Sequence, residues 1–98
     1  MPKYKLSVWQ RKNLHALFSN IQMSGGISLG QIDQCLKIKN KLEYTGKASE
    51  DTDTELELEP ADMKLIKQKA FAASGWPVNK EVKQLKDRLE KYAGNGQA

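Results

Sequence analysis

Apolar and polar residues alternate most clearly in the third quarter of the chain. Leu56 and Leu58 are flanked by glutamates, which is the period of a β-strand with one apolar face. Pro60 follows directly, and a proline at the first position of a helix costs no intrahelical hydrogen bond. The pattern predicts a strand over 54–58 and a helix from residue 60. The apolar positions of that helix are Met63, Ile66, Ala70 and Ala73.

A second helical repeat ends the chain. Ser74-Gly75 is a stop signal for the preceding helix, and Trp76-Pro77 introduces the next one. Apolar residues then recur at intervals of four, three, four and three positions, as on one face of an amphipathic helix. These residues are Val78, Val82, Leu85, Leu89 and Tyr92.

The first half of the chain predicts two further helices. Ser7 and Gln10 have the spacing of a capping box, and Ser28 and Gln31 repeat it 21 residues later. We expect the first helix to bury Leu14, Leu17, Phe18 and Ile21 and to end over 23–26. We expect the apolar side of the second to be Leu29, Ile32, Cys35 and Leu36.

Two short segments complete the predicted β-structure. Residues 42–45 alternate in polarity, and 46–53 have the polar, turn-forming composition of a loop tip. The simplest interpretation is a β-hairpin of 42–45 and 54–58 with a long, acidic, mobile tip. Should 3–6 pair alongside, Lys3 and Lys5 would lie opposite Glu55 and Glu57.

Length and composition indicate one small core. Leu, Ile, Val and Phe together make 21 of 98 residues, close to the lower limit for a charged chain that folds. We predict an α+β, mostly helical, single small domain over 1–93, ordered helix–helix–β-hairpin–helix–helix. The hairpin is expected to pack against the last two helices, and 94–98 is expected to be a flexible C-terminal tail.

The charge is segregated along the chain. Residues 1–47 sum to +6, 48–62 to −7 and 63–98 to +5, so the net charge of +4 conceals an acidic centre between basic flanks. Such a chain satisfies much of its own charge, which weakens the inference from a basic isoelectric point to nucleic acid.

No catalytic or metal-binding pattern is legible. His15 has no carboxylate or serine at a catalytic spacing, and Cys35 fits a core position better than a reactive one. Asp51 to Glu55 begins like a calcium loop but lacks the central glycine and the closing glutamate. We expect no enzyme, no cofactor and no metal. Without a signal peptide or an apolar run of membrane length, a soluble cytoplasmic protein is expected.

Trp9 and the acidic loop are the candidate partner-binding elements. Trp9 projects away from the apolar stripe of its helix, so it folds under the hairpin, caps the end of the helix or anchors a partner. Trp76 is expected to fill the corner between the last two helices. The candidate contact residues are Trp9, Lys12, Asn13, Glu50, Asp51 and Asp53.

Nucleic-acid binding is the first alternative. Residues 27–39 resemble the first helix and turn of a helix-turn-helix module, although Asp33 replaces a small residue and Lys37 replaces the glycine of the turn. Phosphate contacts would come from Lys12, Lys37, Lys39 and Lys41.

Three short motifs carry a family resemblance. Leu6 to Arg11 (LSVWQR), Glu55 to Leu58 (ELEL) and Trp76 to Asn79 (WPVN) together resemble small accessory proteins of bacteriophages and prophages. The resemblance implies a non-secreted viral protein that acts in the host cytoplasm by binding a host or phage protein complex. We therefore expect a non-enzymatic adaptor or inhibitor, monomeric or homodimeric, with a virion structural or assembly component as a further alternative.

Overall fold

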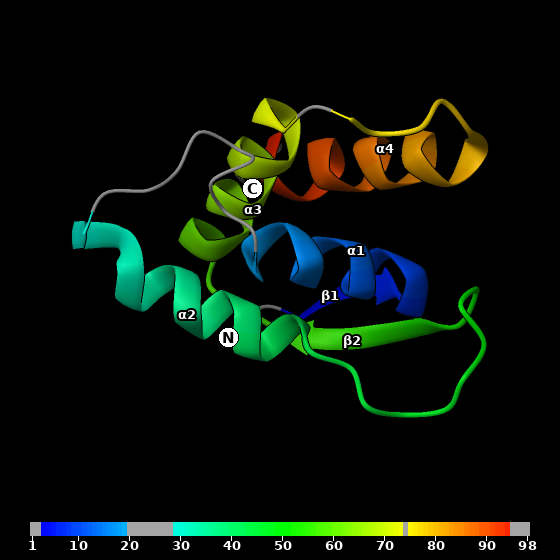
Figure 1. Cartoon of the computed structure of the whole chain (residues 1–98), viewed down its shortest axis with the longest axis horizontal. Helices are drawn as coiled ribbons and strands as arrows, with labels where there is room; N and C mark the ends of the chain where they lie inside the picture. Colours follow the sequence, from blue (N-terminus) through cyan, green and yellow to red (C-terminus); the bar gives the residue numbers. More distant parts are fainter. Residues whose placement is uncertain (1–2, 20–28, 74, 95–98) are drawn as a thin grey trace.

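The computed structural model describes residues 3–19, 29–73 and 75–94 of the 98-residue chain. Over these residues the fold is α+β and mostly helical, as predicted (Figure 1). Along the chain the elements are β1 (Lys3–Ser7), α1 (Val8–Ser19), the short 3-10 turn η2 (Leu29–Gln31), α2 (Ile32–Leu42), β2 (Asp53–Glu57), α3 (Pro60–Ala72) and α4 (Lys80–Gly94).

The sheet joins segments that are far apart in sequence. β1 pairs antiparallel with β2, and Lys3 lies opposite Glu57 while Lys5 lies opposite Glu55, as expected for this pairing. The predicted strand over 42–45 is wrong, because α2 continues through Leu42 and the following residues are irregular. The acidic loop, residues 43–52, therefore connects α2 to β2 and is not the tip of a local hairpin.

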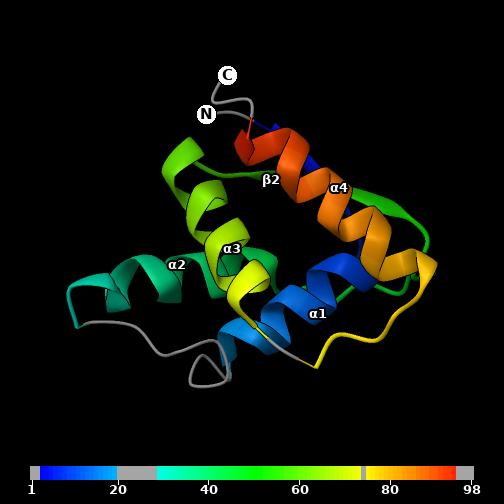
Figure 2. The same cartoon turned by 90° about the horizontal axis from the view of Figure 1, so that it is seen from above.

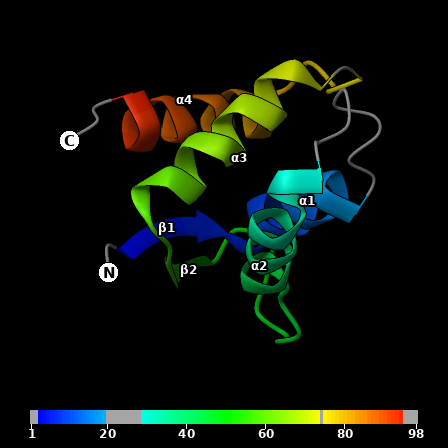
Figure 3. The same cartoon turned by 90° about the vertical axis from the view of Figure 1, so that its left-hand side faces the viewer.

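The described elements pack in two layers, and the sheet belongs to one of them (Figures 2 and 3). α3 and α4 lie together on one side, while β1, β2 and α2 lie on the other and α1 runs between them (Figures 2 and 3). α4 contacts the sheet directly, since the Tyr92 hydroxyl donates to the Lys5 carbonyl over 3.0 Å and the Tyr92 ring meets Tyr4 edge-on. The fully buried core side chains include Leu6, Leu14, Ile38, Leu42, Leu58, Met63, Ile66 and Leu89.

α2 presents a different face to the core from the one predicted. Leu29, Ile32 and Leu36 are 89%, 50% and 54% exposed, whereas Ile38 and Leu42 are completely buried. The buried stripe consists of positions 35, 38 and 42. Its spacing of three and four residues is the same as that of the exposed positions 29, 32 and 36. The chain offers two apolar stripes here, and contacts with α1 and β2 select the later one.

The N-terminus of α1 is fixed by the predicted capping box. The backbone N–H of Gln10 donates to Ser7 Oγ over 3.1 Å, and the backbone N–H of Ser7 donates to Gln10 Oε1 over 2.8 Å. Leu14 and Phe18 are buried as expected, and Leu17 is half-buried. Residues 20–28 lie outside the described residues. They include Ser28 of the second predicted capping box, the predicted core residue Ile21 and the predicted helix stop at 23–26.

Arg11 of α1 holds the C-terminus of α2. Its guanidinium donates to the carbonyls of Lys41, Leu42 and Glu43 and to the Thr54 hydroxyl of β2, over 2.8 to 3.3 Å. A cation at this position neutralises the partial negative charge of the helix end. One side chain thus joins α1, α2 and β2.

α3 begins at Pro60 as predicted and is capped by Glu59 and Asp62, whose side chains exchange bonds with each other's backbone N–H. The Asp62 carboxylate is 2% exposed and accepts from Gln34 Nε2 over 3.1 Å and Lys37 Nζ over 3.0 Å. These contacts tie the start of α3 to α2.

The last two helices largely follow their predicted patterns. α3 ends at Ala72, and Gly75 takes a positive φ of 92°, which glycine adopts without strain. In α4, Leu85 and Leu89 are buried, but Val78 precedes the helix and is fully exposed. α4 extends to Gly94, the first residue of the predicted tail, and 95–98 lie outside the described residues. Within the described segments, no helix combines the length and apolarity that crossing a membrane requires.

Candidate functional site

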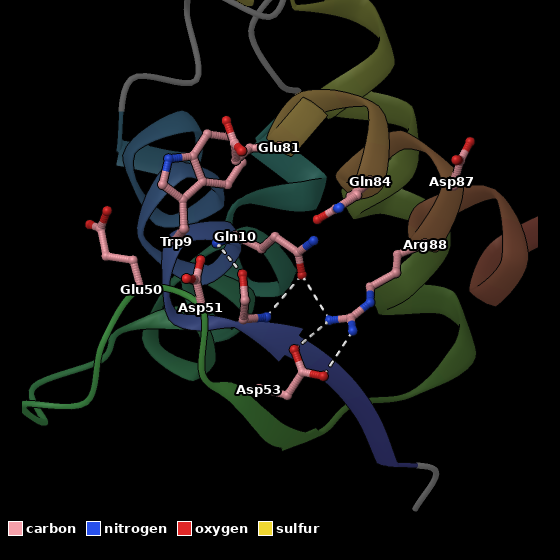
Figure 4. Close-up of a pocket in the computed structure, with 10 residues that line it drawn as sticks. Trp9, Gln10, Glu50, Asp51, Asp53, Glu81, Gln84, Asp87 and Arg88 are labelled. Carbon is pink, nitrogen blue, oxygen red and sulfur yellow. Dashed lines mark hydrogen bonds and ion pairs between the residues drawn. The ribbon is translucent and has the colours of Figure 1, made fainter. Parts of the chain in front are cut away.

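An open cleft of about 760 Å³ lies where the start of α1, the acidic loop and α4 meet (Figure 4). We call it the Trp9 cleft. Five carboxylates and one guanidinium line it, so the charge of its wall is strongly negative. The lining residues are Ser7, Trp9, Gln10, Glu50, Asp51, Asp53, Glu81, Gln84, Asp87 and Arg88.

Main-chain hydrogen bonds position the acidic loop at this cleft. The first N–H groups of α1 lack partners within the helix, and those of Val8 and Trp9 donate instead to the carbonyls of Thr52 (2.9 Å) and Glu50 (3.1 Å). The loop is tightened by a bond from Thr52 N–H to the Ser49 carbonyl. Loop carboxylates are thereby held near a helix N-terminus, where negative charge is favoured.

Arg88 of α4 forms the floor of the cleft with Asp53 and Gln10. Its Nη1 and Nη2 donate to the two Asp53 oxygens over 3.0 and 2.9 Å, and Nη1 also donates to Gln10 Oε1 and to the Lys5 carbonyl. The hydrogen bonds from Arg88 lower the pKa of Asp53, and those to Asp53 raise the pKa of Arg88. This guanidinium is therefore occupied by the protein itself.

The other four carboxylates are less fully neutralised. Glu50 lies 3.9 Å from Lys12 Nζ, and Asp87 lies 2.8 Å from Lys83 Nζ. Asp51 and Glu81 have no ion-pair partner among the residues that the structure describes. The unbalanced negative charge is thus distributed between the loop and the first turn of α4.

Trp9 lies at the boundary between the core and the cleft. Its half-buried ring packs against the edge of the core and also lines the cleft. Among the predicted contact residues, the structure gathers Trp9, Glu50, Asp51 and Asp53 at the cleft, with Lys12 beside Glu50. Asn13 does not line the cleft, and its amide nitrogen donates back to the Trp9 carbonyl over 2.8 Å.

Six of the ten residues that line the cleft were not among the predicted contact residues. Glu81, Gln84, Asp87 and Arg88 belong to the polar side of α4, whose charges read as an ordinary solvated helix surface. Gln10 was identified only as a helix cap. No local pattern indicates that α4 crosses the start of α1.

The lysines of the nucleic-acid hypothesis do not form a helix-turn-helix surface. α2 continues without a break through Lys37, so the turn expected there is wrong. Lys37 is bound by Glu59 and Asp62, each over 3.0 Å, and hydrogen bonds to these two carboxylates raise its pKa. Lys39 and Lys41 follow in the last turn of α2, while Lys12 lies in α1 beside the acidic loop.

The reactive side chains lie elsewhere. Cys35 is buried in the core, as predicted, and burial raises the pKa of its thiol. His15 is half-buried on α1 and does not line the cleft. Across the described segments, no three histidine, cysteine, aspartate or glutamate side chains converge in a way that could hold a metal ion.

A second, apolar groove of about 250 Å³ lies between α3 and α4. Trp76 lines it and donates from Nε1 to the Ala70 carbonyl over 3.0 Å. Its half-buried ring packs against the core, so it closes the corner between the two helices as expected.

No match to this chain was found among protein-family models, curated proteins or solved structures. The geometry and charge of the Trp9 cleft are therefore the basis for assigning a function.

Proposed function

We propose that the protein is a non-enzymatic protein-binding module, acting as an adaptor or inhibitor, and that the Trp9 cleft is its contact surface. One observation carries the proposal: an indole ring and five carboxylates from three separate segments converge on one open hollow. Tryptophan is enriched at the energetic centres of protein interfaces, and charged surroundings speed association with a complementary partner.

The same charge argues against a nucleic acid as the ligand of this cleft. Three of the five carboxylates pair with Lys12, Lys83 and Arg88, and the two that remain leave the wall net negative, which disfavours phosphates. A phage or prophage setting, with a host or phage complex as the partner, is proposed on the resemblance of the three motifs alone.

Affinity capture from a bacterial lysate, followed by mass spectrometry, tests the proposal. Trp9→Ala should lose the partners that the wild-type protein retains. Because Trp9 also packs against the core, its removal will lower the melting temperature. A destabilised control is therefore needed, and Ile38→Val serves because Ile38 is completely buried in α2, outside the cleft.

The control should keep the partners despite its lower stability. Equal losses from both variants would assign the effect to unfolding, and unchanged capture by Trp9→Ala would exclude the cleft as the contact surface.

A further inference from the structure

We infer that the Trp9 cleft receives a basic segment of a partner protein, with an arginine or lysine side chain among the carboxylates and an adjacent main-chain carbonyl bound by Gln10. This inference rests on the proposed function and specifies the chemistry of the partner. Two independent features of the cleft support it, its charge and the buried amide of Gln10.

The charge of the cleft selects a cation. The guanidinium of Arg88 is already paired with both oxygens of Asp53, so it is not free to bind an anionic ligand. Asp51 and Glu81 have no ion-pair partner within the described segments, and both line the cleft with Trp9. A guanidinium or ammonium can pair with such carboxylates and lie against an indole ring, which attracts cations through its π-face.

Gln10 adds a requirement that charge alone does not explain. Its side chain is 4% exposed, and its Oε1 accepts from both Ser7 N–H and Arg88 Nη1. Two donors at one end fix the orientation of the amide, so the other end must be the NH₂ group. Figure 4 shows this nitrogen directed away from Arg88 and toward the side of the cleft where Gln84 stands.

Nε2 of Gln10 has no acceptor among the described residues. A buried donor without a partner is costly, and a ligand that supplies an acceptor recovers that cost. The acidic wall disfavours an anionic acceptor, whereas a peptide carbonyl is neutral. A basic peptide carries the cation and the carbonyl a few bonds apart, and this combination distinguishes it from a free amine or a metal ion.

The test is an NMR titration of the ¹⁵N-labelled protein at low salt. The probe is a five-residue peptide of alternating glycine and arginine with both ends blocked. The control peptide carries glutamate in place of arginine, and methylguanidinium supplies the charge without the carbonyl. We expect the basic peptide to shift the indole N–H signal of Trp9 and the side-chain NH₂ signals of Gln10. Methylguanidinium should shift only the Trp9 indole signal, and the acidic peptide should shift neither the Trp9 nor the Gln10 signals.

Gln10→Glu separates the donor from the charge. A glutamate keeps the acceptor for Ser7 N–H and Arg88, loses the NH₂ donors and adds one negative charge. Electrostatics alone predicts tighter binding of the basic peptide. Our inference predicts binding at least about fivefold weaker, the lower end of the cost of an unpaired buried polar group. The affinity for methylguanidinium should not fall.

A surface variant guards against a folding defect in Gln10→Glu. Asp51→Asn combined with Glu81→Gln changes two exposed side chains and should weaken binding of both the peptide and methylguanidinium. The inference is overturned if the basic peptide leaves the Trp9 and Gln10 signals unmoved, or if Gln10→Glu binds it as tightly as or more tightly than the wild type. Trp9-dependent capture of a lysate partner, without peptide binding, would overturn this inference alone and leave the proposed function standing.

Discussion

Replacing Arg11 with alanine should destabilise the protein markedly, because its guanidinium joins three elements of the fold. Its bonds to the Leu42 carbonyl and the Thr54 hydroxyl are partly buried and contribute about 1 kcal/mol each. The bonds to the Lys41 and Glu43 carbonyls are exposed, so water replaces them at little cost. Loss of the cation at the end of α2 adds about 0.5 kcal/mol, for a total of about 2 to 3 kcal/mol.

Urea unfolding followed by circular dichroism measures this loss. A domain of this size has a total stability of about 5 to 10 kcal/mol, so the midpoint should fall markedly while the slope is unchanged. Arg11→Lys keeps the charge but not the planar fork that spans four acceptors, and it should recover less than half of the loss.

The neighbouring Lys12 is the matched control. Lys12→Ala removes an exposed charge whose ion pair spans 3.9 Å and should cost no more than about 0.5 kcal/mol. A loss below about 1 kcal/mol for Arg11→Ala, or full recovery by Arg11→Lys, would refute the role assigned to this guanidinium.

Three further predictions concern other parts of the fold. Ile38→Ala should lower the free energy of unfolding, measured in urea, by about 2 to 5 kcal/mol because Ile38 is completely buried. Leu36→Ala, at a 54% exposed position, should change it by less than about 0.5 kcal/mol. A larger loss for Leu36→Ala than for Ile38→Ala would show that the other face of α2 packs in the core. Burial alone would raise the pKa of Asp62, but the hydrogen bonds to its carboxylate hold the pKa below the ordinary value of 3.8. The stability that Asp62 contributes should therefore persist above that value and be lost as the pH falls through the folded pKa. Urea midpoints at pH 7, 5, 4 and 3 should show this decline, and the decline should be smaller in Asp62→Asn. Ser7→Ala removes the acceptor for the backbone N–H of Gln10 and should lower the free energy of unfolding by about 1 kcal/mol, with Ser7→Thr as the variant that preserves it.

Features set by neighbouring residues could be predicted from the sequence. The capping box at Ser7 and Gln10 and the start of α3 at Pro60 depend on groups within one helical turn, and the spacing of Leu85 and Leu89 gives α4 its apolar stripe. For the capping box and the helix start, both partners lie within four residues of each other.

Features set by distant residues could not be predicted in the same way. α2 carries two apolar stripes of equal spacing, and only its packing neighbours decide that Ile38 is buried and Leu36 is exposed. The sequence offered two strand partners for β2, residues 42–45 and residues 3–6. Residues 42–45 do not pair with β2 because Arg11 and the core extend α2 through Leu42. The Trp9 cleft was predicted only in part, since its loop and indole stand out in the sequence while Arg88 is one charge among many on α4.

The pairing of β1 with β2 also sets the route by which the chain reaches its native state. The strand partners are 46 to 54 positions apart, from Ser7 with Asp53 to Lys3 with Glu57. Bringing such remote segments together costs configurational entropy before any ladder bond repays it, so folding should be slower than for a helical bundle of equal length. The anchoring of the acidic loop to the start of α1 depends on that same closure, so the Trp9 cleft should form only after the two strands have paired.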